Sequence, residues 1–259
     1  MPRNVRVFVV SLGCLLLGAA VATFLPLGEG RIHATPLASP SWPHVLGSDV
    51  VGRDNLERTA RATWNSVVQA ILVVVVSAML GYAAALVSTI YRGTFADRAI
   101  ELLSELLRAF PALIGAIVLV SLGIAPFLVV TTYFAANIWR VSTVLLREEE
   151  GLPYVLSAQM SGLSRSRAVA VEASMNVVPR MSGALVLTFS EIIAVLETMA
   201  FLGVGRLYEV PTLGSLLRDA FQFGLDTPLS WLPALCVLLA LPFGLIFSCQ
   251  TLLAPRRTL

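Results

Sequence analysis

Six long apolar runs constrain what this chain can fold into more than any other feature of its sequence. They lie near residues 5–26, 65–91, 100–121, 125–146, 176–200 and 228–252. About 20 helical residues cross the roughly 30 Å of hydrocarbon in a bilayer, and each run is long enough to do so. The runs are continuous and lack the alternation of polar and apolar residues that strands of a membrane barrel show. The sequence therefore predicts an all-α, polytopic membrane helix bundle with about six transmembrane helices.

The runs divide the chain into three parts. Residues 1–27 form an N-terminal transmembrane helix, residues 28–63 an external segment rich in turn formers, and residues 64–259 a five-helix core. The first run follows Arg3 and Arg6 and contains small residues, so a signal peptide is the alternative. We favour an uncleaved helix, because the run is longer than the roughly 7 to 15 apolar residues of a signal.

Arginines set the expected orientation, because cytoplasmic loops of membrane proteins carry an excess of basic residues. With the N-terminus inside, the short cytoplasmic segments hold nine arginines and the two long external segments hold six. We therefore expect a multi-pass protein of the bacterial cytoplasmic (inner) membrane with a cytoplasmic N-terminus.

The residue inventory excludes several classes of function. All 18 basic residues are arginine, so the chain has no P-loop lysine and no Schiff-base lysine. The net charge of +2 is scattered between apolar runs, which is a poor footprint for nucleic acid. The three cysteines stand alone, and His33 and His44 have no further ligands near them in sequence. We expect no metal site, no catalytic residue, no cofactor and no nucleic-acid partner in this chain.

The loop between the fourth and fifth runs, residues 147–167, has a helical pattern of its own. Gly151 and Pro153 end the preceding helix, a short helix follows up to Met160, and Gly162 stops it. Val155 lies three residues before Ala158, which gives this helix a small apolar face. The face either packs on the chain's own membrane domain or binds a partner, and the pattern alone leaves both open.

Three charged residues of the third run also share a helix face. Glu101, Glu105 and Arg108 follow one another at spacings of four and three. This spacing predicts an internal ion pair near the cytoplasmic end of the run.

Several separated motifs occur in a fixed order along the chain. His44 to Asp54 reads HVLGSDVVGRD before the second run, and Arg108 to Pro111 reads RAFP in the third. Residues 154–162 read YVLSAQMSG in the cytoplasmic loop, and Phe201 to Gly205 (FLGVG) and Pro211 to Gly214 (PTLG) follow the fifth run. Together they resemble the motifs of the permease subunit of binding-protein-dependent ABC importers of the dipeptide, oligopeptide and nickel group.

The chain departs from this family in the cytoplasmic loop. The family's E-A-A motif reads Leu156-Ser157-Ala158 here and lacks the acid, although the terminal glycine is present as Gly162. The departure indicates a dedicated ATPase partner, or an assembly whose other permease carries the stronger motif.

The resemblance implies a type I ABC importer permease fold and a division of labour between subunits. This chain would form a heterodimer with a paralogous permease subunit and would not itself be an enzyme. Two ATPase subunits would bind ATP and Mg, and an extracytoplasmic solute-binding protein would deliver a small polar solute of the peptide, nickel or metal-chelate class. A non-transporting assembly or sensory membrane subunit with the same fold is the alternative.

The resemblance also implies two contact surfaces. In the cytoplasmic loop, the residues expected to contact the ATPase are Tyr154, Val155, Ala158, Gly162 and Leu163. On the external side, the residues expected to dock the binding protein are Phe201, Gly203, Gly205, Pro211 and Gly214. The alternative for the external residues is a re-entrant loop that packs on the bundle, since irregular backbone at membrane depth needs protein or water around it.

Charged residues inside a span are costly, so each is a functional candidate, and a proline inside a span is a place where a helix kinks. The candidates for the translocation path or gate are Phe110, Pro111, Arg140, Arg180, Glu191 and Glu197. The alternative for the charged ones is that they pair helix with helix.

Overall fold

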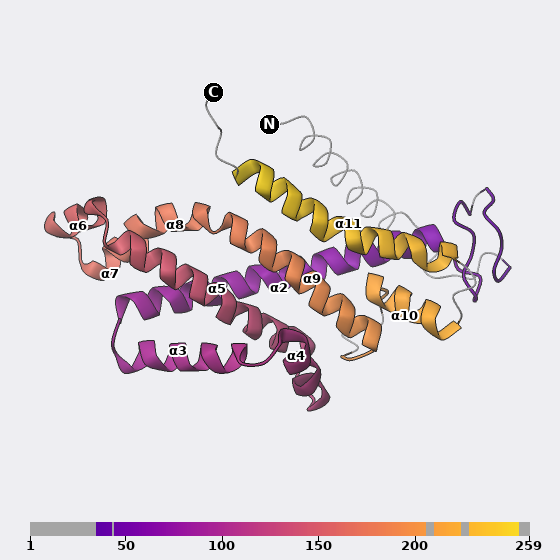
Figure 1. Cartoon of the computed structure of the whole chain (residues 1–259), viewed down its shortest axis with the longest axis horizontal. Coiled ribbons are helices and arrows are strands. Elements are labelled where there is room, and N and C mark those ends of the chain that lie inside the picture. Colours follow the sequence, from indigo (N-terminus) through magenta and orange to yellow (C-terminus); the bar gives the residue numbers. More distant parts are fainter. Residues whose placement is uncertain (1–34, 43, 206–209, 224–227, 254–259) are drawn as a thin grey trace, which may run out of the picture. The chain divides into compact units, whose positions relative to one another are not determined.

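The computed structural model describes residues 35–42, 44–205, 210–223 and 228–253, so the first predicted helix, residues 5–26, lies outside the described residues. Helices are the only regular elements of this part of the chain, which confirms the all-α prediction (Figure 1). In chain order they are α2 (Asn55–Ile90), α3 (Phe95–Arg108), α4 (Ala112–Ser121), α5 (Pro126–Glu150), α6 (Pro153–Met160), α7 (Arg165–Arg167), the π-helix η1 (Ala168–Ala173), α8 (Ser174–Arg180), α9 (Ser182–Leu202), α10 (Leu213–Phe223) and α11 (Pro228–Leu253).

Four of the described helices are long and apolar enough to cross a membrane. They are α2, α5, α9 and the Pro228–Phe247 part of α11. A fifth span results only if α3 and α4 are taken together. The six predicted runs thus correspond to four spanning helices, one bent pair and one segment outside the described residues.

The third run, residues 100–121, bends sharply instead of forming one straight helix. α3 ends at Arg108, α4 begins at Ala112, and the two axes differ by 92°. Pro111 precedes α4 with φ −56° and ψ 133°, outside the helical region. Proline has no N–H to donate and disfavours a helical conformation in the residue before it, so the helix ends there. The structure therefore has a bend of about a right angle at Pro111, where the sequence predicts a kink.

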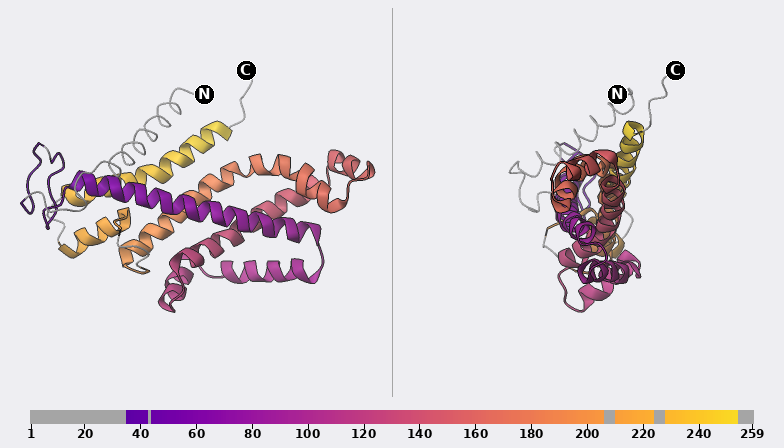
Figure 2. Two further views of the ribbon diagram at one scale, coloured as in Figure 1. Left: turned by 180° about the vertical axis from the view of Figure 1, so that it is seen from behind. Right: turned by 90° about the vertical axis from the view of Figure 1, so that its left-hand side faces the viewer.

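The chain forms two compact units. Leu72–Ile192 makes one, and the residues up to Ile71 together with those from Ile193 make the other. In the Leu72–Ile192 unit, a tight turn at residues 91–94 joins α2 to α3 (Figure 2). Gly81 of α2 lies so close to α5 that an added Cβ would be 2.5 Å from the Ala135 carbonyl oxygen. A small residue is needed where two helix backbones approach this closely.

The core of the Leu72–Ile192 unit draws on α5, α6, η1 and α8. Its fully buried members include Leu146, Val155, Val169 and Val177. Because α6 contributes Val155 to this core, the short helix is fixed to its own unit by an apolar side chain.

Candidate functional site

α6 is the short helix that the sequence predicts within residues 147–167. Pro153 occupies its first turn, where a missing N–H removes no helical hydrogen bond. At its end the Gly162 N–H donates to the Gln159 oxygen (3.0 Å) and the Leu163 N–H to the Ala158 oxygen (3.2 Å), which are the paired bonds of a Schellman motif. Gly162 has φ +98°, a conformation that favours glycine. The expected sharp exit at Gly162 is confirmed.

One side of α6 packs against its own unit, and the other side is exposed. Val155 is fully buried, whereas Leu156 and Met160 are 47% and 89% exposed. Of the five residues expected to contact an ATPase, Val155 therefore packs inward, while Ala158 and Leu163 are half-buried. Sequence reasoning missed Leu156 and Met160, because apolar spacing does not reveal which side of a short helix its own chain covers.

Glu149, the last but one residue of α5, is a buried carboxylate that joins three elements. Arg180 Nη1 of α8 donates to Glu149 Oε1 at 2.6 Å, and the Tyr154 hydroxyl of α6 donates to Glu149 Oε2. Burial raises the pKa of the Tyr154 phenol, and its hydrogen bond to Glu149 raises this pKa further. Tyr154 therefore remains a protonated donor, and Arg180 is placed at this joint as an ion-pair partner.

Two more ion pairs fasten neighbouring segments of this unit. Arg165 Nε binds Glu150 Oε1 at 2.6 Å, and its Nη2 donates to the Thr89 oxygen at 3.2 Å near the end of α2. Arg147 Nη2 of α5 binds Asp97 Oδ1 of α3 at 3.0 Å. The loop after α6 and the start of α3 are thus both held by arginines.

The predicted pairing within α3 is wrong. Glu101, Glu105 and Arg108 form no ion pair with one another in the described structure, and the Arg108 Nε donates to the Ser104 oxygen at 3.2 Å. All three line a groove toward α5, and the Arg108 guanidinium is directed instead to the backbone of its own helix. Arg140 of α5 lies beside the same groove.

The other path candidates of the Leu72–Ile192 unit lie on its surface. Phe110 is 63% exposed at the bend between α3 and α4, and Glu191 is exposed on α9. The sequence places Arg180 and Glu191 on one helix face, but α8 ends at Arg180 and α9 begins at Ser182. Met181, between the two helices, keeps helical backbone angles (φ −70°, ψ −16°), and its N–H donates to the Val177 oxygen at 3.0 Å, so the backbone stays helical across the join.

In the other unit, the His44–Asp54 motif folds into a compact loop before α2. Asp49 is 2% exposed, and its Oδ1 accepts the backbone N–H groups of Val51 (2.9 Å) and Arg53 (2.8 Å). Its Oδ2 binds Arg53 Nε and Arg58 Nη1, both at 2.7 Å. Burial alone would raise the pKa of the Asp49 carboxyl, but the hydrogen bonds from Arg53 and the charge of Arg58 hold this pKa below its usual value.

The end of the same motif starts α2. The Asp54 Oδ1 accepts the Glu57 N–H at 2.9 Å, which caps the helix, while Asp54 Oδ2 lies 2.7 Å from His44 Nδ1. The motif is therefore a loop whose acids and bases satisfy one another and set where α2 begins.

α10 is held at its N-terminal end by α2 and α9. The Gly214 N–H donates to the carboxylate of Glu197, a residue of α9 that is 3% exposed. The Leu213 N–H donates to Ser66 Oγ at 3.1 Å, and Asn65 Nδ2 donates to the Pro211 oxygen at 2.9 Å. The first N–H groups of a helix lack partners within it, and here other elements supply them. Glu197 of α9 is thus joined to the start of α10 by this hydrogen bond.

The glycines and aromatic residues after α9 pack closely on α10. A Cβ on Gly214 would lie 2.1 Å from the Glu197 carbonyl oxygen, and a Cβ on Gly203 would lie 2.4 Å from the Arg218 guanidinium. The rings of Phe201 and Phe221 meet edge to face at 5.3 Å. Of the five predicted docking residues, Pro211 and Gly214 therefore lie at the start of α10, Phe201 and Gly203 contact its second half, and Gly205 (φ +63°) lies in the connecting turn.

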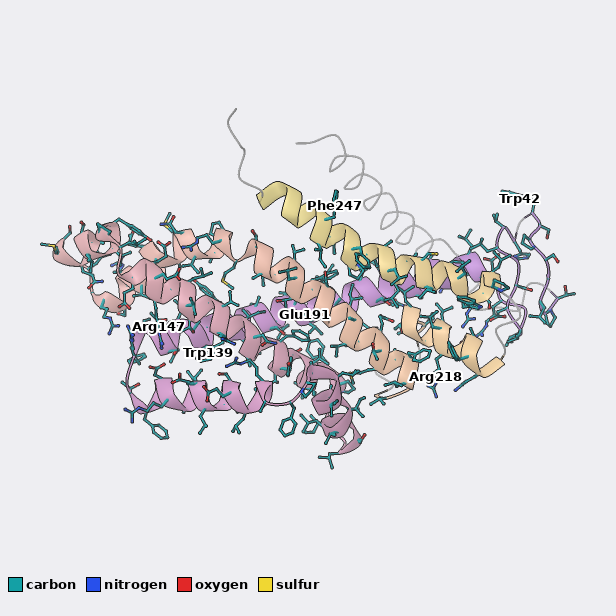
Figure 3. All side chains as sticks on the ribbon, in the orientation of Figure 1. Trp42, Trp139, Arg147, Glu191, Arg218 and Phe247 are labelled. Carbon is teal, nitrogen blue, oxygen red and sulfur yellow. The ribbon has the colours of Figure 1, made fainter. Side chains whose placement is uncertain are left out.

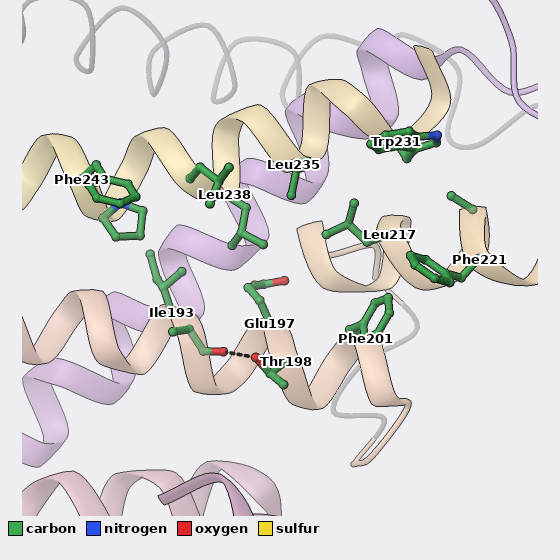
Figure 4. Close-up of a pocket in the computed structure, with 14 residues that line it drawn as sticks. Ile193, Glu197, Thr198, Phe201, Leu217, Phe221, Trp231, Leu235, Leu238 and Phe243 are labelled. Atoms are coloured by element: carbon green, nitrogen blue, oxygen red, sulfur yellow. Dashed lines mark hydrogen bonds between the residues drawn. The ribbon is translucent and has the colours of Figure 1, made fainter. Parts of the chain in front are cut away.

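Glu197 also borders an apolar cavity of about 610 Å³ between α9, α10 and α11. Figure 4 shows the carboxyl of Glu197 directed toward α10, with Phe201, Phe221 and Trp231 along the same cavity. A second contact reaches α10 from the first turn of α2, since Arg58 Nη2 binds Asp219 Oδ2 at 2.7 Å while its Nη1 binds Asp49. Arg58 therefore links the His44–Asp54 motif, through Asp49, to Asp219 in the second half of α10.

No family model matches this chain. The chain is 28% identical to the dipeptide transport system permease protein DppC of Haemophilus influenzae over 244 residues, which cover 90% of this chain and 81% of that protein. It is 30% identical over 192 residues to the glutathione transport system permease protein GsiD of Pectobacterium atrosepticum, covering 70% of this chain and 61% of that protein. A DppC of Alkalihalophilus pseudofirmus is 24% identical over 220 residues, covering 80% of this chain and 71% of that protein. The resemblance drawn from the motifs is confirmed, and the chain is a homologue of the permease proteins of dipeptide, peptide and glutathione transport systems.

Proposed function

We propose that this chain is the transmembrane permease subunit of an ABC importer for peptides or peptide-like solutes. The observation that carries the proposal is similarity along most of the chain to transport system permease proteins, together with helices long and apolar enough to span a membrane. The relatives favour peptides and glutathione within the wider class of small polar solutes, which also includes nickel and metal chelates.

In the proposed assembly, α6 is the point of contact with an ATPase subunit on the cytoplasmic side. The exposed side chains Leu156 and Met160 would enter that contact, while Val155 holds the helix to its own unit. Glu149 supports this role, because it ties Tyr154 of α6 and Arg180 of α8 to the end of α5. A movement of α6 would therefore reach both helices. ATP and Mg would bind in the partner ATPases.

On the external side, the site around the start of α10 is the proposed contact for a solute-binding protein. Glu197, Ser66 and Asn65 fasten this end of α10 to α9 and α2. A paralogous permease subunit would complete the pathway.

The experiment is reconstitution of this chain in proteoliposomes with a second permease, two ATPase subunits and a binding protein from the same genome. We expect ATP-dependent uptake of a labelled dipeptide and ATP hydrolysis stimulated by the loaded binding protein. The alternative, a non-transporting assembly or sensory subunit, predicts a stable complex without uptake of any solute of the class.

A further inference from the structure

A groove of about 450 Å³ lies between α3 and α5 in the Leu72–Ile192 unit. Figure 3 labels Trp139 and Arg147 on the part of α5 that runs along α3. α5 contributes Trp139, Arg140, Thr143 and Arg147 to the lining, and α3 contributes Glu101, Glu105 and Arg108. We call this feature the α3–α5 groove.

Two side chains of the groove are buried and yet have a polar atom without a partner. Trp139 is 7% exposed and Thr143 is 5% exposed, but Trp139 Nε1 and Thr143 Oγ1 make no hydrogen bond within the described part of the chain. Thr132 and Ser142 of the same helix donate their hydroxyls at 2.7 Å to the carbonyl four residues earlier. Buried polar atoms without partners are costly and rare, and because these two atoms are closed off from solvent, they lie behind the surface of the groove.

Most charged side chains of the groove also form no ion pair within the described residues. Within the described residues, Arg140, Glu101 and Glu105 form no ion pair, and Arg108 uses only its Nε on a backbone oxygen. Arg147 is the exception, because it is paired with Asp97. The groove therefore offers two free guanidinium groups and two free carboxylates, beside a helix that qualifies as a membrane span. Charged groups in that position are functional candidates.

We propose that the α3–α5 groove binds the solute during its passage, and that the solute is a small zwitterion with a carboxylate at one end and an ammonium at the other. This inference rests on the proposed function. The carboxylate would lie against Arg140 and Arg108, because their guanidinium groups carry positive charge and donate hydrogen bonds. The ammonium would lie against Glu101 and Glu105. Since the free charges of the groove balance, a zwitterion fits it better than a simple anion or cation.

The test measures binding through Trp139 in the assembled complex. The tryptophans are replaced by 5-fluorotryptophan, and the Trp139 resonance is assigned by comparison with Trp139→Phe. Dialanine is then titrated, alongside dialanine amide, N-acetyldialanine and inorganic phosphate. We expect a saturable ¹⁹F shift with dialanine and binding at least about tenfold weaker for each blocked peptide, because each lacks one charge.

Arg140→Gln gives the second readout, with Arg98→Gln as the matched control. Arg98 is exposed on α3 and does not line the groove. We expect Arg140→Gln to lower dialanine affinity and ATP-dependent dialanine uptake by about tenfold, and Arg98→Gln to leave both unchanged.

Three results would overturn the inference: equal shifts with phosphate and dialanine, equal binding of the blocked peptides, or wild-type behaviour of Arg140→Gln. If the wild-type complex takes up dialanine while the Trp139 resonance stays fixed, the groove assignment fails and the proposed function stands. If the wild-type complex takes up no dialanine, the proposed function fails for peptides.

Discussion

Asp49, Glu149 and Glu197 are carboxylates that are 2%, 6% and 3% exposed, and each receives hydrogen bonds from other parts of its unit. Removing the partners of a buried charge is strongly destabilising, so these residues fix where the neighbouring segments lie. Asp49 organises the loop before α2, Glu149 holds α6 and α8, and Glu197 holds α10.

Glu197→Ala is expected to destabilise the chain by about 2 kcal/mol, because the Gly214 N–H loses its side-chain acceptor in a buried site. Glu197→Gln should recover part of this loss, since the amide oxygen still accepts. Unfolding in mixed detergent micelles measures both, and Glu191→Ala is the control, because Glu191 is exposed on the same helix. Equal losses for Glu197→Ala and Glu191→Ala would contradict the assignment.

The ion pairs of Asp49 make the stability of the loop before α2 depend on pH. The pKa of Asp49 is lowered from 3.8, so its stabilising effect is complete above that value and is lost as pH falls through the lower folded-state pKa. Asp49→Asn should therefore unfold at a lower temperature than the wild type near about pH 6, with the gap closing toward about pH 3. Thermal unfolding across this range measures the effect. A gap that does not change with pH would show that the ionisation of Asp49 is not what stabilises the loop.

At the scale of elements, α6 buries one side, with Val155, in its own unit and exposes Leu156 and Met160 on the other. Leu156→Glu or Met160→Glu should weaken association with an ATPase subunit by about tenfold without unfolding the chain, because both side chains are exposed. Val155→Glu should instead destabilise the chain itself, because it places a charge in the core. Co-purification with the ATPase and the melting temperature separate the two effects. If Leu156→Glu and Met160→Glu both leave co-purification intact, α6 is not the contact.

The elements also show how far the sequence could predict the fold. Apolar runs predict α2, α5, α9 and α11, and Pro153 with Gly162 predicts α6, because these signals are local. The 92° bend at Pro111 is larger than a kink, because α3 is amphipathic and packs along α5 rather than continuing into α4. Sequence reasoning found Glu197, Gly214 and Arg180 but not the pairing of Glu197 with Gly214 or of Arg180 with Glu149, because such partners lie far apart along the chain.

For the whole molecule, the described residues supply four spanning helices, or five with the bent pair. Nine arginines in the short segments predicted to be cytoplasmic, against six in the external ones, predict that α6 lies on the cytoplasmic side. The proposed function depends on this placement, since an ATPase subunit can reach α6 only there.

A single cysteine at Met160 tests this most directly, in a chain whose Cys14, Cys236 and Cys249 are replaced by serine. Met160 is 89% exposed, so the new thiol is accessible wherever α6 lies. A membrane-impermeant maleimide should label it in inverted vesicles but not in right-side-out vesicles, and a bound ATPase subunit should protect it. Labelling in right-side-out vesicles, or labelling that the ATPase leaves unchanged, would contradict the account.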